Sequence, residues 1–229
     1  LYANIDLFVN DKELVDYSKR PEIDRWIISK LNALVEEYET SMDAYDVTRA
    51  ARAVMNFTID ELSNWYVRRS RRRFWKSDLT EAKLSAYQTL HECLLTVSKL
   101  ISPFAPFIAE DLYGRLTINK DNAEESVHLC SFPKVTYREP ELEEKMEAVQ
   151  KVVYITRSMR AKHNLKVRQP LKKIMAAVAG KLKEPLETMK DVILDEVNIK
   201  ELVILTDDSG IVKKSAKPNF KTLGAKNGK

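Results

Sequence analysis

The chain has 229 residues and a formal net charge of +4, with 31% charged and 44% apolar residues but only five glycines and eight prolines. This composition excludes disordered and collagen-like chains and favours one or two soluble, helix-rich domains. The two cysteines, Cys93 and Cys130, lie in different segments without a CxxC companion. A disulfide framework and a zinc site are therefore not indicated, and a reducing compartment is expected.

The start of the sequence has neither a methionine nor the basic head of a signal peptide. No apolar run approaches the roughly 20 residues that span a bilayer. We therefore interpret the sequence as part of a longer, cytoplasmic chain.

Two long amphipathic helices are predicted first. Apolar residues recur at helical spacing over residues 21–39, where Pro21 suits the first helical position. The next helix begins after Asp46, a favourable N-cap, and continues to Trp75. Its predicted core stripe consists of Ala51, Met55, Ile59, Leu62 and Tyr66.

Two further helices follow with short connections. One is predicted over residues 80–101, and the other begins near Pro106 and ends near Gly114. Four such helices predict an antiparallel helical bundle, whose core would be made by their apolar stripes.

The pattern changes after residue 117. A polar loop and a short extended segment, "VHLCSFP", lead to a boundary between residues 136 and 137. Beyond it we expect a helix over residues 141–163 and then a strand, a helix and a strand. The fold class is therefore mainly α, with a helical bundle in residues 1–136 and a small α/β unit in residues 137–229.

Basic residues are concentrated in three stretches, residues 49–76, 157–173 and 210–229. The second and third contain no acidic residue. This distribution indicates a surface for a polyanion, although a set of solvated faces would give the same pattern.

The first stretch contains "NWYVRRSRRRFW", residues 64–75. At 100° per residue, Arg69 and Arg73 continue the core stripe. The opposite face is predicted to contact RNA, because guanidinium groups bind phosphate oxygens in pairs and an indole can stack on a base. This face consists of Arg68, Arg71, Arg72 and Trp75. The alternative is a charged end of a core helix, with the arginines paired to carboxylates.

The second stretch ends a helix and enters a loop. Cations in the last turn suit the negative end of the helix dipole, which gives part of this charge a structural explanation. A loop rich in hydrogen-bond donors is also a common place for a polar ligand. The predicted RNA-binding residues here are Arg160, Lys162, His163, Lys166 and Arg168.

Catalytic patterns are absent from the sequence. His91, His128 and His163 lie far apart without the spacing of metal ligands, and there is no phosphate-binding glycine loop. We therefore expect neither catalysis, a bound metal nor a cofactor in this chain alone.

Three motifs in order resemble class I aminoacyl-tRNA synthetases of the isoleucyl, valyl and leucyl group: "DRWIISKLN", "SNWYVRRSRRRFW" and "SPFAPFIAEDLYGRL". Together with "MRAKHNLKVRQPL", "VNIKEL" and "KPNFKTLG", they are most similar to the isoleucyl members. The resemblance implies the helical anticodon-binding region, which contacts the anticodon stem and loop of an isoleucine-accepting tRNA.

The resemblance also implies a parent ligase that uses ATP with magnesium. Catalytic and editing domains would belong to the same polypeptide, which is expected to be a cytoplasmic monomer. The HIGH and KMSKS signatures of the family are missing from this sequence, so the chain alone is predicted to be inactive. Two alternatives remain: a helical protein-interaction scaffold, or the same region of a valyl- or leucyl-type enzyme.

Overall fold

The computed structural model describes residues 6, 8, 14–75, 78, 80–118, 123–178 and 180–205. The basic stretch predicted at residues 210–229 lies outside the described residues. The chain divides into a first unit, Leu1–Glu143, and a second unit, Glu144–Lys229. The predicted boundary at residue 136 falls slightly earlier and stays a prediction. None of the described helices has the length and apolar character needed to cross a membrane.

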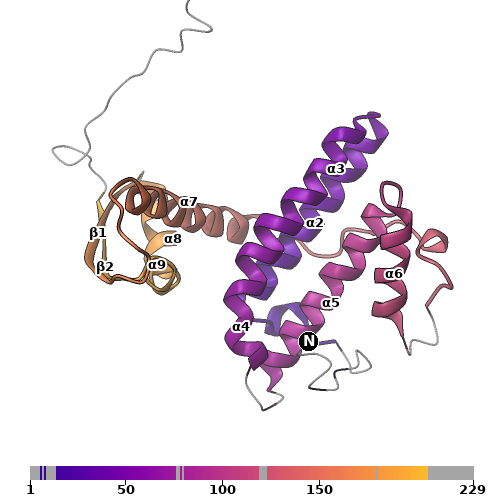
Figure 1. The fold of residues 1–229 in the computed structure, drawn as a ribbon, viewed down its shortest axis with the longest axis horizontal. Helices are drawn as coiled ribbons and strands as arrows, with labels where there is room; N and C mark the ends of the chain where they lie inside the picture. The colour runs from indigo at the N-terminus through magenta and orange to yellow at the C-terminus, as the bar shows by residue number, and fades with distance from the viewer. Residues whose placement is uncertain are drawn as a thin grey trace, which may run out of the picture. The chain divides into compact units, whose positions relative to one another are not determined.

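The regular secondary structure described in the first unit is all helical (Figure 1). Its main helices are α2 (Glu22–Asp43), α3 (Val47–Asn56), η2 (Phe57–Val67), α4 (Arg68–Trp75), α5 (Glu81–Ile101) and α6 (Pro106–Thr117). Two short 3-10 turns, η1 (Tyr17–Lys19) and η3 (Val127–Leu129), are added to them. All four predicted helices are present, and the mainly α fold class is confirmed.

Local capping explains where several of these helices begin. The side chain of Asp46 accepts a hydrogen bond from the backbone N–H of Arg49 at 3.0 Å, and Thr80 caps Lys83 in the same way at 3.3 Å. Pro106 occupies the first turn of α6, where its missing N–H costs nothing. These starts are as the sequence predicted.

The turn between α2 and α3 closes in a Schellman arrangement. Tyr45 N–H donates to the carbonyl of Met42 at 2.9 Å, and Asp46 N–H donates to that of Ser41 at 2.8 Å. Tyr45 has φ 58°, the left-handed conformation that glycine usually occupies at this position, and its side chain is 90% exposed. The turn therefore carries backbone strain at an exposed tyrosine.

The long helix from Val47 to Trp75 contains a π-helical segment, η2, which corrects the predicted core stripe. Met55 and Ile59, expected in the core, are 52% and 49% exposed. Two residues of the predicted stripe, Leu62 and Tyr66, are buried, and the other buried residues of this helix are Ala50, Val54, Phe57, Trp65, Ser70 and Phe74. The step of five from Phe57 to Leu62 follows from the i→i+5 hydrogen bonds of a π-helix, which turn the buried face away from the α-helical extrapolation.

Helix α5 is also packed differently from its apolar pattern. Several small or polar residues are fully buried on it, among them Ser85, Thr89 and Ser98. Leu84, an apolar residue of the same helix, is only half-buried. Because α5 contacts α2, α3, α4 and α6, more of its circumference is covered than one apolar stripe could fill.

An irregular segment from Ser131 to Glu139 follows η3, where a short extended segment was predicted at residues 127–133. The backbone N–H of Thr136 donates to Asn32 Oδ1 at 2.8 Å, and that of Glu139 donates to Ser29 Oγ at 2.7 Å. Both acceptors are buried side chains of α2. The segment is therefore held along the first long helix of the unit.

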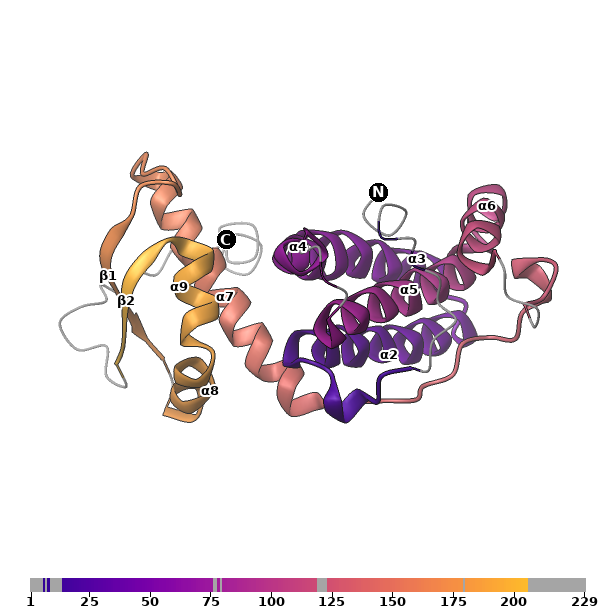
Figure 2. The ribbon, with the colours of Figure 1, turned by 90° about the horizontal axis from the view of Figure 1, so that it is seen from below.

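The second unit contains most of α7 (Pro140–Lys162) and a two-stranded parallel sheet. Strand β1 (Leu171–Ala177) pairs with β2 (Ile199–Leu205), in the register Leu171 to Ile199. Between them lie η4 (Gly180–Leu182), α8 (Lys183–Thr188) and α9 (Lys190–Val197). Figure 2 shows α7, α8 and α9 on the same side of the strand pair.

The predicted strand, helix and strand order is thus confirmed with one correction. The single helix expected over residues 185–197 is two helices, separated at Met189, whose backbone leaves the helical region at φ −100° and ψ 21°.

Candidate nucleic-acid interface

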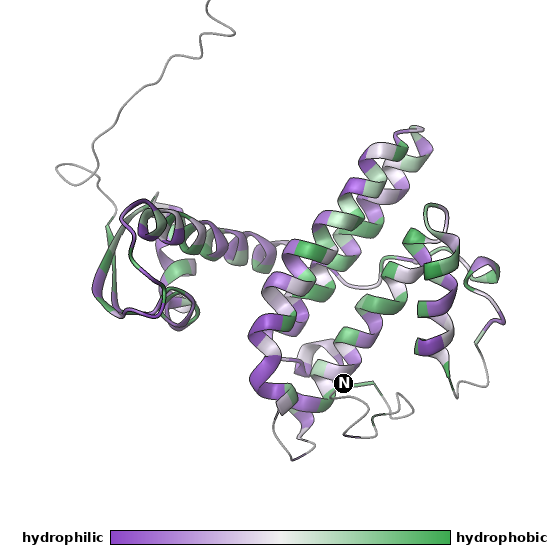
Figure 3. Ribbon diagram, viewed as in Figure 1, coloured by the Kyte–Doolittle hydropathy of each residue, from purple (hydrophilic) through white to green (hydrophobic). Residues whose placement is uncertain are grey.

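Helix α4 carries the arginine-rich motif at one end of the first unit, where Figure 3 shows hydrophilic residues gathered. Two of its side chains, Ser70 and Phe74, are buried. The ring of Phe74 lies 5.2 Å from that of Tyr87 on α5, in a cluster completed by Ala86. Helix α4 is the end of the long helix that begins at Val47, and these contacts hold that end against α5.

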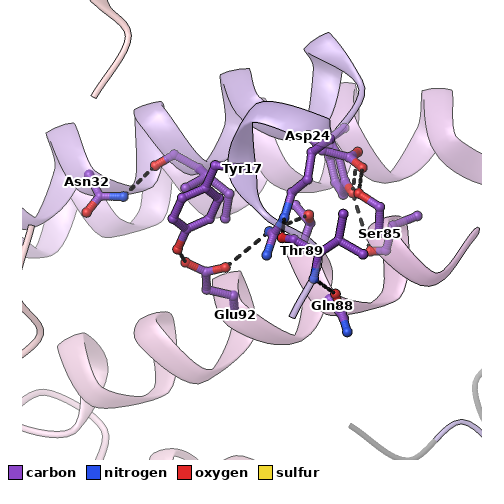
Figure 4. Close-up of polar contacts among 12 residues, drawn as sticks. Tyr17, Asp24, Asn32, Ser85, Gln88, Thr89 and Glu92 are labelled. Atoms are coloured by element: carbon purple, nitrogen blue, oxygen red, sulfur yellow. Dashed lines mark hydrogen bonds and ion pairs between the residues drawn. The ribbon is translucent and has the colours of Figure 1, made fainter. Parts of the chain in front are cut away.

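Arg73 is fixed by a buried carboxylate on α2. Asp24 is fully buried and accepts hydrogen bonds from Arg73 Nη1 at 2.6 Å and Nη2 at 2.7 Å. Tyr66 Oη donates to the same carboxylate at 3.0 Å, and Ser85 Oγ donates at 2.6 Å (Figure 4). Each carboxylate oxygen thereby accepts two hydrogen bonds, which satisfies a group that would be costly to bury unpaired.

The electrostatics of this cluster follow from burial and charge. Burial, and then the charge of Asp24, raise the pKa of Tyr66 well above its ordinary value. Burial opposes the charge of Arg73, but its hydrogen bonds and ion pair with Asp24 outweigh this effect and raise the guanidinium pKa. Arg73 is thus a charged structural residue, as its place on the core side of the motif predicted.

Arg68 and Arg69 lie against Trp65. Their guanidinium carbons are 5.9 Å and 5.8 Å from the centroid of its ring, a distance at which cation–π attraction operates. Arg68 Nε also donates to the carbonyl of Asn64 at 2.8 Å. The structure therefore places Arg68, predicted on the outward face, half-buried beside an aromatic ring.

Arg71, Arg72 and Trp75 point to solvent. All three are exposed, Trp75 by 61%. Within the described ranges, the side chains of Arg71 and Arg72 form no hydrogen bond or ion pair with another residue. The predicted outward face is therefore brought together at these three residues, and it presents two arginine side chains with an indole.

A second ion pair, with a buried guanidinium and a half-buried carboxylate, lies elsewhere in the first unit. Arg20 Nη1 donates to Thr89 Oγ1 at 3.0 Å and pairs with Glu92 Oε2 at 3.3 Å. Tyr17 Oη donates to Glu92 Oε1 at 2.7 Å (Figure 4). Burial and the contact with Glu92 raise the pKa of Tyr17 to about 12. This cluster joins α5 to the segment before α2.

Asp24 and Arg20 were not identified from the sequence. Asp24 carried a usable signal, because it shares the apolar face of its helix with Ile27, Ile28 and Leu31. A carboxylate on an apolar face requires a partner, and Arg73 was the residue predicted to face the core. Arg20 offered no comparable pattern.

In the second unit, Arg160 must be corrected as a predicted RNA-binding residue. It is 2% exposed and donates to three backbone carbonyls, those of Lys166 at 2.9 Å, Gln169 at 3.0 Å and Asn198 at 3.1 Å. Its guanidinium is therefore enclosed by the loop after α7. The sequence pattern could not show that the loop folds back over the last turn of the helix.

Asn198 completes this loop from the start of β2. It adopts φ 52°, and its Nδ2 donates to the carbonyls of Val167 at 3.0 Å and Arg168 at 3.1 Å. Arg157, one turn before the end of α7, pairs with Glu196 of α9 at 2.6 Å. The loop between α7 and β1 is therefore held by Arg160 of α7 and by Asn198, which precedes β2.

The remaining predicted residues of this stretch are exposed on this loop and at the end of α7. They are Lys162, His163, Lys166 and Arg168. Over the residues that the structure covers, none of their side chains forms an ion pair. These four side chains are free to donate hydrogen bonds to the phosphates of a polyanion.

A cavity of about 520 Å³ between α2 and α3 is lined by both signs of charge, and two of its ion pairs are Arg49–Glu37 and Lys30–Glu61. His91 Nε2 lies 2.8 Å from the carbonyl of Leu116. Among the described residues, no three potential metal ligands come together. In the part of the chain that the structure describes, α4 and the α7–β1 loop carry the predicted site residues whose side chains are exposed without an ion pair.

These features define a helical bundle with a basic, aromatic-bearing helix, and sequence comparison identifies the class. Residues 24–175 match the family described as the anticodon-binding domain of tRNA ligase, over more than half of the chain. The chain belongs to this family, which confirms the resemblance of its motifs.

The similar curated proteins are isoleucine–tRNA ligases. That of Porphyromonas gingivalis is 48% identical over 232 residues, which cover 100% of this chain and 20% of the relative. Those of Cytophaga hutchinsonii and Bacteroides thetaiotaomicron are 44% and 46% identical, again over the whole chain, with 21% and 20% of the relative covered. The chain thus spans about a fifth of the length of the curated relatives it matches.

Proposed function

We propose that this chain binds the anticodon stem and loop of an isoleucine-accepting tRNA, with Arg71, Arg72 and Trp75 of α4 as its main contacts. The observation that carries the proposal is that the arginines of one motif differ in their partners. Arg73 is neutralised by Asp24, whereas Arg71 and Arg72 are exposed without an ion pair in the described structure. Two uncompensated guanidinium groups beside an exposed indole suit phosphates next to an unstacked base.

Lys162, His163, Lys166 and Arg168 form a second proposed contact with the same RNA. Their loop is held by Arg160 and Asn198, so its side chains are displayed on a fixed backbone. Contacts of this kind supply affinity and salt dependence but little sequence information.

We further propose that the longer protein is an isoleucine–tRNA ligase that uses ATP with magnesium and acts in the cytoplasm as a monomer. Its catalytic and editing domains would lie outside this chain, since the relatives are about five times longer. The chain alone would then show no isoleucine-dependent pyrophosphate exchange. Exchange by the pure chain would contradict this assignment.

The test of RNA binding is a titration with an isoleucine-accepting tRNA transcript at several salt concentrations. Replacing Arg71 and Arg72 by alanine should flatten the plot of log K against log salt by up to about two units, one for each lost phosphate contact. Arg115→Ala is the matched control, because Arg115 is an exposed arginine on α6 that already pairs with Asp111 at 2.9 Å.

An isolated anticodon stem-loop should compete for the same site, whereas an acceptor-stem minihelix should compete poorly. Equal competition by both RNAs would reject anticodon recognition. A double variant that binds like the unmodified chain would reject α4 as the contact.

A further inference from the structure

We infer that Asp24 is a positioning residue for RNA binding: by holding Arg73 inward, it fixes the rotation of α4 that presents Arg71, Arg72 and Trp75 to the ligand. The inference rests on the proposed function of α4. It assigns a role in binding to a fully buried carboxylate on another helix, which itself cannot touch the RNA.

The geometry of the ion pair is that of a clamp. Both terminal nitrogens of Arg73 contact Asp24, at 2.6 Å and 2.7 Å, so the guanidinium plane is fixed in two directions. Arg73 Nη2 also donates to the carbonyl of Ala82 at 2.6 Å, at the start of α5. One side chain of α4 is therefore tied to two other helices.

The clamp controls which residues of α4 face solvent. Successive residues of an α-helix are 100° apart, so Arg72 and Arg73 cannot face the same direction. With Arg73 held at Asp24, Arg72 and Arg71 are turned outward, as their exposure shows. A rotation of α4 by one residue would exchange Arg72 for Arg73 at the core and displace the indole of Trp75.

Asp24 is itself held by groups that do not belong to α4. Ser85 Oγ on α5 donates to it at 2.6 Å, and Tyr66 Oη on η2 donates at 3.0 Å. These bonds hold the carboxylate in place in addition to its contacts with Arg73. Preorganisation of this kind is what a binding surface on a short helix needs.

The test uses Asp24→Asn in the full chain, where charge and positioning predict opposite results. Removing an acidic side chain makes the protein more positive, which by charge alone strengthens its attraction to tRNA. If Asp24 positions α4, the variant should instead bind tRNA roughly tenfold more weakly, with a salt dependence flatter by about one unit, the change expected for one lost phosphate contact.

Glu92→Gln is the matched control for a general loss of stability. It also breaks an arginine–carboxylate pair, that of the buried Arg20, but Glu92 contacts η1 and the segment before α2 instead of α4. Binding is measured below the unfolding transition of each variant, monitored by tryptophan fluorescence. All three tryptophans, Trp26, Trp65 and Trp75, belong to the first unit, so their signal reports its folding.

The outcomes separate this inference from the proposed function. If Asp24→Asn binds tRNA as well as or better than the unmodified chain, while replacing Arg71 and Arg72 weakens binding, the positioning role is wrong and the contact surface stands. If replacing Arg71 and Arg72 has no effect, the proposed surface itself fails, and the positioning role fails with it. Equal weakening by Asp24→Asn and Glu92→Gln would reduce Asp24 to an ordinary stabilising residue.

Ser85→Ala is the second variant in case Asp24→Asn does not fold. It removes one of the four hydrogen bonds to the carboxylate and leaves the ion pair in place. A roughly twofold to threefold loss of tRNA affinity is expected from it, and unchanged affinity in a folded Ser85→Ala chain would overturn the inference.

Discussion

Replacing Arg160 by methionine tests whether this residue organises the loop between α7 and β1. Methionine keeps an unbranched apolar stem but removes the three hydrogen bonds to the carbonyls of Lys166, Gln169 and Asn198. Hydrogen bonds from a charged donor contribute about 1.5 to 3 kcal/mol each. Against this, the buried guanidinium no longer has to be desolvated, and water can reach the carbonyls of the exposed loop residues. We therefore expect a net loss of roughly 3 kcal/mol, about 1 kcal/mol for each bond.

Native-state amide exchange measures this loss in the unit where it occurs. A change of about 3 kcal/mol corresponds to exchange roughly a hundredfold faster. The informative amides are those of the β1–β2 pair, including that of Leu171, which donates to the carbonyl of Asn198 at 3.2 Å. Tryptophan fluorescence should be unchanged, because all three tryptophans are in the first unit.

Lys162→Met is the control for this experiment. Lys162 ends the same helix but is exposed, so its loss should change stability by no more than about 0.5 kcal/mol. Exchange in Arg160→Met that stays within 0.5 kcal/mol of the unmodified chain, by the same surface-residue range, would refute the structural role of Arg160. Leaving Arg160 out of the proposed RNA contacts would then be unjustified.

Three other predictions concern the first unit. Tyr45→Gly should raise its stability by up to about 1 kcal/mol in denaturant unfolding, because glycine adopts the left-handed conformation without strain, and a loss of stability would contradict this. Trp65→Ala should lower the free energy of unfolding by about 3 to 5 kcal/mol, whereas Trp75→Ala should lower it by less than about 0.5 kcal/mol. Trp75→Ala should instead weaken tRNA binding by roughly 1 to 3 kcal/mol if the indole stacks on a base. The raised pKa of Tyr17, about 12, supplies stability that is fully present below pH 10 and is lost as pH rises through 12, so Tyr17→Phe should lessen alkaline unfolding. The effect should be smaller than the full shift implies, since Tyr17 is partly solvated, and identical alkaline curves would argue against it.

The helices could be predicted because their signals are local. Asp46 and Thr80 cap helices through N–H groups three residues ahead of them, and the α2 stripe through Trp26, Ile27 and Leu31 is buried as its spacing indicates. Both features depend only on neighbours within one or two turns. The same holds for the outward direction of Arg71 and Arg72.

The predictions that were wrong concern residues whose positions depend on contacts distant in sequence. Met55 and Ile59 were placed in the core by a constant 100° step, but the π-helical segment depends on how Phe57 and Leu62 pack against other helices. Arg160 donates to the carbonyl of Asn198, directly before β2 and 38 residues away in sequence. A periodicity argument contains no information about such partners.

The return of residues 131–139 to α2 has a consequence for synthesis on the ribosome. Asn32 and Thr136 are 104 residues apart, and Ser29 and Glu139 are 110 residues apart. Helix α2 leaves the ribosome early, yet Asn32 Oδ1 and Ser29 Oγ do not receive these backbone N–H donors until the end of the unit has been translated. At about 5 to 20 residues per second, this interval lasts roughly 5 to 20 s. During this interval the incomplete bundle exposes the side of α2 that residues 131–139 later cover. A chaperone would bind α2 on this side and in this interval.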